Sequence, residues 1–137
     1  MKNPIKKYKS LNSACKSVGF EVEVPPRFKL NEIFVISNKI IELRYSSVIV
    51  RKTKYDKSIT GDKGISGVYS GAYPNDCYKG DFKTDEIEGV EYWNGSTKCP
   101  KTYLAIWNDL AHNYSYSVYA PKGIKLKSMA TWQKKFK

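Results

Sequence analysis

The stretch KLNEIFVISNKIIELRYSSVIVRKTK, residues 29–54, contains three short apolar runs separated by two polar steps. Each run is rich in Val, Ile, Leu, Phe and Tyr, the residue types that favour strands. The polar steps, Ser37-Asn38-Lys39 and Ser46-Ser47, are short enough to form hairpin turns. The stretch therefore predicts three antiparallel strands that follow one another as a meander.

The last run of this stretch, residues 48–54, alternates in a way that assigns its side chains to two faces. Successive side chains of a strand point to opposite sides of a sheet. The pattern predicts Val48, Val50 and Lys52 on one face and Ile49, Arg51 and Thr53 on the other.

The segment before the meander predicts one helix and one further strand. Ser10 is a suitable N-cap, and apolar residues recur at helical spacing through residues 11–18. Gly19 suits the left-handed position that ends a helix. Residues 20–24 alternate strictly between apolar and acidic side chains, which predicts a strand that ends at Pro25.

The chain after the meander predicts further strands and a closing helix. A glycine-rich excursion occupies residues 55–83, and Asn94-Gly95 is the strongest hairpin-turn signal of the sequence. Four strands are predicted in this part, at residues 77–82, 85–93, 102–108 and 114–119. Residues 124–136 have the pattern of a basic amphipathic helix.

This order of elements predicts an α+β fold, a curved antiparallel sheet (a meander) with an N-terminal and a C-terminal helix. The length of 137 residues fits one domain. We take residues 1–9 as a basic, loosely ordered lead-in and residues 10–137 as a single domain. A helix is expected on one face of the sheet, and the other face is expected to be more polar and rich in tyrosine.

The chain is strongly basic, with 24 Lys and Arg against 13 Asp and Glu and a formal net charge of +11. Such a charge favours a nucleic acid, an anionic surface polymer or membrane, or an acidic protein as the partner. Only three residues are arginines, whereas proteins that read nucleic acids use arginine for its planar fork. Nucleic acid is therefore the less favoured partner. We find no apolar run that predicts a transmembrane segment or a signal peptide.

The three cysteines are Cys15, Cys77 and Cys99. An odd number excludes a fully paired set within one chain. Cys77 and Cys99 lie in the loop-rich part of the chain, and they would form a disulfide only in an oxidising compartment. Cys15 lies in the predicted N-terminal helix and is expected to be a buried thiol.

The sequence carries no recognised catalytic, cofactor or metal motif. The GxSxG and HExxH patterns and the phosphate-binding glycine loops are absent. His112, the only histidine, lies in a predicted hairpin loop, where a solvated side chain is expected. A zinc site would need four ligands from distant loops. We therefore expect no catalytic residue, no metal and no cofactor.

Several short motifs, in order along nearly the whole chain, resemble a known family. It is the domain of unknown function found in small predicted lipoproteins and anti-sigma-factor-like ectodomains of Gram-positive bacteria. The motifs are residues 10–20 (SLNSACKSVGF), 41–45 (IELRY, against the family's IEIRY), 50–52 (VRK), 65–69 (ISGVY, against ISGDY), 103–107 (YLAIW, against YLATW) and 114–117 (YSYS). The segment from Cys77 to Cys99 is not typical of the family.

The resemblance implies a non-enzymatic domain outside the cytoplasm, secreted or tethered by a lipid. From it and from the charge we expect a binding or sensing domain for an anionic surface polymer or an acidic protein. The candidate ligand-binding residues are Tyr45, Arg51, Tyr114 and Tyr116, with residues 61–83 as a lid. The alternatives are a cytoplasmic nucleic-acid-binding domain, whose affinity would fall steeply with salt, and an uncharacterised enzyme.

Overall fold

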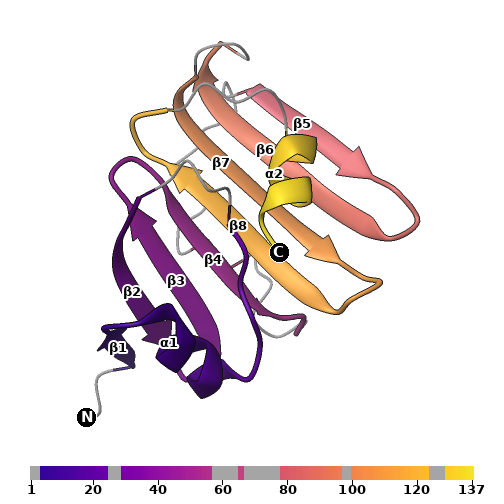
Figure 1. Cartoon of the computed structure of the whole chain (residues 1–137). Helices are drawn as coiled ribbons and strands as arrows, with labels where there is room; N and C mark the ends of the chain where they lie inside the picture. Colours follow the sequence, from indigo (N-terminus) through magenta and orange to yellow (C-terminus); the bar gives the residue numbers. More distant parts are fainter. Residues whose placement is uncertain (1–3, 25–28, 57–64, 67–77, 97–99, 124–128) are drawn as a thin grey trace.

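The computed structural model describes residues 4–24, 29–56, 65–66, 78–96, 100–123 and 129–137. In this part of the chain, eight antiparallel strands form one open sheet, and two helices accompany it (Figure 1). The α+β class predicted from the sequence is confirmed at this level.

The strands follow the order β1-β2-β3-β4-β8-β7-β6-β5 across the sheet. Their bounds are β1 Ile5–Tyr8, β2 Leu30–Ile36, β3 Ile40–Tyr45, β4 Ile49–Lys54, β5 Tyr78–Lys83, β6 Ile87–Gly95, β7 Pro100–Asp109 and β8 Tyr114–Ala120. The three-strand meander predicted for residues 29–54 is confirmed as β2, β3 and β4. Its first turn has positive φ at Ser37 and Asn38, the backbone geometry that joins two strands most tightly.

The sheet consists of two meanders and not of one. Strands β1 to β4 form the first and β5 to β8 the second, and β4 pairs with β8 where the two meet. The expectation of a single meander is therefore wrong at this point. The next described strand after β4 is β5, which lies at the far edge of the sheet, and β8 returns to the centre beside β4.

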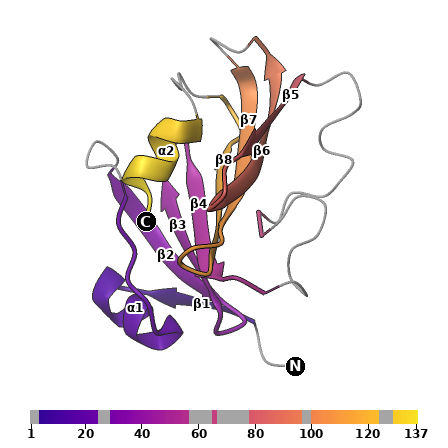
Figure 2. The same cartoon turned by 90° about the vertical axis from the view of Figure 1, so that its right-hand side faces the viewer.

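Both helices lie over the same side of the sheet (Figure 2). Helix α1, Leu11–Val18, begins at Ser10, whose hydroxyl accepts a hydrogen bond from the Ser13 N–H, and it ends at Gly19 with φ of 84°. Helix α2, Met129–Lys135, places Trp132 in the core, and Phe136, which directly follows the helix, is also part of the core. We call this side the helix face and the other side the opposite face.

The hydrophobic core lies between the sheet and the elements on the helix face. Strand residues on this face include Ile41, Leu43, Val50 and Val118, all at most 1% exposed. The opposite face buries polar side chains instead, among them Glu42, Thr53, Ser115 and Ser117. On this opposite face, Arg51 of β4 donates a hydrogen bond to the carbonyl oxygen of Ile65 at 3.0 Å. This contact places Ile65 on the opposite face.

Three local predictions differ from the structure. Residues 20–24 show the predicted alternation of burial but form no strand of the sheet, and Glu23 exchanges main-chain hydrogen bonds with Lys137. Ile5–Tyr8, expected to be loosely ordered, forms edge strand β1 because it finds a partner in β2. Strand β6 continues through Asn94 and Gly95, where a bulge against β7 gives Gly95 its positive φ.

Candidate functional site

Lys52 is a buried cation in the middle of the helix face. It lies on β4 between Ile41 of β3 and Tyr116 of β8, and only 4% of its surface is exposed. Its ammonium donates hydrogen bonds to the main-chain oxygens of Glu21, at 2.6 Å, and Lys137, at 2.9 Å. The side chain thus ties two segments of chain to the sheet.

Aromatic rings surround the same ammonium group. Its nitrogen lies 4.2 Å from the ring centre of Tyr114, 5.3 Å from that of Phe20 and 5.6 Å from that of Tyr116. The faces of aromatic rings attract cations, and the attraction grows when water is excluded. The rings therefore stabilise the charge without neutralising it.

The charge of Lys52 is not in direct contact with an acidic side chain of the described residues. Within the described residues, no aspartate or glutamate oxygen lies within 4.0 Å of its nitrogen. Burial lowers the pKa of Lys52, and the nearby Cys15, Glu21 and Asp109 oppose this shift. An ammonium has three N–H groups, and the two main-chain oxygens engage two of them.

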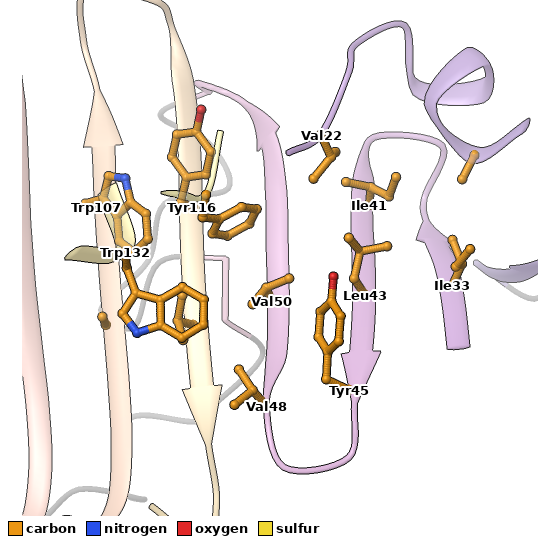
Figure 3. Packing of buried hydrophobic residues seen from close by; sticks show 14 of the residues in the cluster. Val22, Ile33, Ile41, Leu43, Tyr45, Val48, Val50, Trp107, Tyr116 and Trp132 are labelled. Carbon is orange, nitrogen blue, oxygen red and sulfur yellow. The ribbon is translucent and has the colours of Figure 1, made fainter. Parts of the chain in front are cut away.

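A cavity of about 210 Å³ opens beside this ammonium group, and we call it the Lys52 pocket. One wall is aromatic, because Trp107 stacks on Tyr116 with 5.2 Å between ring centres, and Phe136 packs edge-on against Tyr116 at 5.0 Å. Figure 3 shows Trp107 and Tyr116 side by side on neighbouring strands. The lining residues are Lys52, Ile87, Trp107, Asp109, His112, Tyr114, Tyr116, Gln133, Phe136 and Lys137.

Two further polar residues line the Lys52 pocket: Asp109 at the end of β7 and His112 in the turn that leads to β8. The Asp109 carboxylate accepts a hydrogen bond from the His112 main-chain N–H at 3.1 Å, and its other oxygen lies 2.8 Å from His112 Nδ1. The side chain of His112 is 72% exposed, whereas that of Asp109 is only 19% exposed. Asp109 therefore fixes the ring orientation and contributes a negative charge to the lining.

Gln133 of α2 brings an unsatisfied donor to the same lining. Its Nε2 atom is buried, and in the described part of the chain no hydrogen-bond acceptor meets it. A buried N–H group without an acceptor costs about 1–3 kcal/mol. The pocket thus has spare donor capacity from both Lys52 and Gln133.

Of the four residues predicted from the sequence, Tyr114 and Tyr116 line the Lys52 pocket. Tyr45 shares their face but lies at the other end of the core, beside Val48 (Figure 3). Its burial raises its pKa to about 12. The face away from the helices was expected to be rich in tyrosine, but these three tyrosines lie on the helix face, where Tyr45 and Tyr116 are buried in the core and Tyr114 packs against it.

Arg51, the fourth predicted residue, lies on the opposite face. Its guanidinium contacts the buried Glu42 carboxylate at 2.7 Å, and Arg44 contacts the other oxygen at 2.8 Å. Glu42 is therefore held between two arginines. Because Arg51 lies on the opposite face of the sheet, it is separated from Tyr114 and Tyr116.

The remaining predictions lie partly outside the described residues. Cys77 and Cys99, and most of the lid expected at residues 61–83, fall there. Ile65 and Ser66 are described, and Ile65 contacts Arg51 on the face opposite to the Lys52 pocket. Cys15 is confirmed as a buried free thiol, and burial raises its pKa.

The sequence interpretation missed Lys52, Asp109 and Gln133 as candidate site residues. A signal was present for Lys52, because the alternation of residues 48–54 placed it on the apolar side with Val48 and Val50. Asp109 and His112 also have the three-residue spacing of a side chain that binds the next turn of main chain. No sequence signal connected these residues with Gln133.

Comparisons with protein-family models, with curated proteins and with solved structures found no match to this chain. The described helices include none of the length and apolar character needed to cross a membrane. A search of the described residues found no group of three or more His, Cys, Asp or Glu side chains that could hold a metal ion.

Proposed function

We propose that the protein is a non-enzymatic binding domain that acts outside the cytoplasm and holds the acidic group of an anionic ligand in the Lys52 pocket. The observation that carries the proposal is the convergence of two donors on one cavity. The Lys52 ammonium has an N–H group beyond the two that bind main-chain oxygens, and the Gln133 amide has no acceptor in the described structure. A carboxylate oxygen would accept from both.

The size of the pocket limits what it can take. Sites for drug-sized ligands usually enclose about 300–1,000 Å³, whereas the Lys52 pocket encloses about 210 Å³. The ligand is therefore a small molecule or the acidic end of a larger one, such as a surface polymer or an acidic protein. The net charge of +11 supports attraction of either to the surface.

The location outside the cytoplasm is supported by the resemblance to ectodomains and lipoproteins of Gram-positive bacteria. That family carries no established catalytic residues, which supports a binding role. The lysine-rich composition also favours an anionic partner over sequence-specific nucleic-acid recognition.

The test compares butyrate with butyramide, which has nearly the same shape but no charge. We expect butyrate to shift the indole N–H resonance of Trp107 saturably in a nuclear magnetic resonance titration at constant ionic strength. Butyramide should bind at least about tenfold more weakly, because hydrogen bonds to charged groups contribute about 1.5–3 kcal/mol. The saturable shift should disappear in Lys52→Met.

Lys54→Met is the matched control, since Lys54 lies on the same strand but is exposed and outside the pocket lining. It removes the same charge and should leave binding unchanged. Gln133→Leu provides a second variant that keeps both Lys52 hydrogen bonds, and it should weaken butyrate binding about threefold or more. Equal binding of butyrate and butyramide, or of butyrate to all variants, would refute the proposal.

A further inference from the structure

The Lys52 pocket carries charges of both signs at separate positions. Lys52 supplies a cation, and Asp109 supplies a carboxylate that lines the same cavity. No ion pair joins the two groups, so the Lys52 nitrogen and the Asp109 oxygens lie more than 4.0 Å apart. The negative charge of Asp109 nevertheless acts on Lys52. The two charged residues therefore line one cavity without pairing with each other.

The hydrogen-bonding capacity of Asp109 is only partly used. A carboxylate has about four acceptor positions on its two oxygens. The main-chain N–H and the Nδ1 atom of His112 engage one position on each oxygen. Each oxygen keeps a position for a further donor, and an ammonium group is the donor that complements its charge.

Part of the lining of the Lys52 pocket is aromatic. The rings of Trp107, Tyr116 and Phe136 pack against one another and line the pocket. Rings of this kind accommodate an aliphatic or aromatic side chain but add no further charge. The lining thus presents a cation, an anion and an apolar wall to one small volume.

We propose that the ligand of this pocket is a zwitterion of the α-amino-acid type with an apolar side chain. Its carboxylate binds the Lys52 ammonium and the Gln133 amide, its ammonium binds Asp109, and its side chain contacts the rings. This assignment rests on the proposed function, since both place an acidic group at Lys52, and it adds the ammonium contact. The free volume of about 210 Å³ corresponds to about seven water molecules.

The experiment measures three probes by calorimetric titration against the full chain at one ionic strength. L-leucine carries both charges, N-acetyl-L-leucine carries only the carboxylate, and L-leucinamide carries only the ammonium. We expect L-leucine to bind about tenfold more tightly than N-acetyl-L-leucine, and leucinamide to bind most weakly.

Asp109→Asn keeps an oxygen that can accept from the His112 main-chain N–H, so it removes the charge and preserves the turn. In this variant the advantage of L-leucine over N-acetyl-L-leucine should disappear. Asp81→Asn is the control, because Asp81 is exposed on edge strand β5, and it should keep the advantage.

The outcomes separate the two proposals. If N-acetyl-L-leucine binds as tightly as L-leucine and both require Lys52, the ammonium contact is refuted and the proposed function stands. If no probe that carries a carboxylate binds, both are refuted. Loss of the L-leucine advantage in Asp81→Asn as well as in Asp109→Asn would also overturn the assignment to Asp109, because it would indicate an unspecific charge effect.

Discussion

Arg51 and Lys52 are adjacent on β4, yet their side chains lie on opposite faces of the sheet and their charges have different contacts. Arg51 on the opposite face contacts the Glu42 carboxylate at 2.7 Å. Lys52 on the helix face contacts main-chain oxygens and rings and no acidic side chain of the described residues. A buried charge that is paired with an acidic side chain has a structural explanation, whereas a buried charge without such a partner remains able to attract a ligand.

The largest expected effect comes from removal of the paired carboxylate. Glu42→Gln leaves Arg44 and Arg51 with a neutral partner, and a broken buried ion pair destabilises a protein by about 3–5 kcal/mol. We expect a loss of about that size in the free energy of unfolding, measured by urea denaturation. Butyrate binding in the Lys52 pocket should persist below the unfolding transition, because Glu42 lies on the other face.

Arg44→Gln is the matched control on the same cluster. The Arg44 side chain is 42% exposed, so its pair with Glu42 is screened by solvent, and we expect a loss below about 1 kcal/mol. Equal losses in Glu42→Gln and Arg44→Gln would contradict the view that Glu42 is the centre of this cluster.

A smaller effect should appear at alkaline pH through Tyr45. Its folded-state pKa is raised to about 12 from 10.0 because burial disfavours the phenolate. The folded chain therefore keeps the proton more tightly than the unfolded chain. The stability from Tyr45 is complete below pH 10 and is lost as the pH rises from 10 to 12.

At pH 11.5 this loss should be about 2 kcal/mol. The measurement is the change in the free energy of unfolding between pH 8 and pH 11.5, followed by circular dichroism. Tyr45→Phe should lose about 2 kcal/mol less over this interval than the wild type. An identical pH dependence in both proteins would show that Tyr45 does not contribute to the loss of stability between pH 8 and pH 11.5.

Apart from the control variants, the smallest expected effect is that of Lys52→Met on stability. The variant loses two hydrogen bonds, but it also removes the unfavourable burial of a charge. We expect a net loss of about 1–2 kcal/mol at pH 7, against less than about 0.5 kcal/mol for Lys54→Met. A loss as large as that of Glu42→Gln would remove the contrast between the two faces.

The pH dependence of this difference has a definite sign. The pKa of Lys52 is lowered in the folded state, so the unfolded chain binds the proton more tightly. Raising the pH from the folded-state value to 10.5 therefore adds stability through Lys52. The wild type should gain this contribution relative to Lys52→Met, the reverse of the change expected for Tyr45.

Local patterns in the sequence predicted strands β2 to β8 and the first helix, but not edge strand β1. The alternation in residues 48–54 placed Lys52 with Val50, and Ser10 and Gly19 located both ends of α1. Such features depend on residues close together in the chain. The same local rule was wrong for residues 20–24, because alternation reports burial of one side but not the presence of a neighbouring strand.

The site could not be predicted, because it depends on contacts between distant segments. Lys52 faces Tyr116 only through the pairing of β4 with β8, and Gln133 reaches the pocket only because α2 lies over the same face. The separation of Arg51 from the tyrosines follows from the same pairing. The sequence predicts which residues share a face of one strand, but not which strands become neighbours.

The pairing of β4 with β8 also has a consequence for how fast the chain folds. Each meander consists mainly of hairpins between consecutive strands, which close within about 1–10 μs. The contact between Val50 and Val118 instead joins residues from the two halves of the sequence. Closing so long a loop loses entropy before any contact compensates, so proteins of this topology fold in milliseconds to seconds. The docking of the two meanders, which also builds the wall between Lys52 and Tyr116, is therefore expected to be the rate-limiting step of folding.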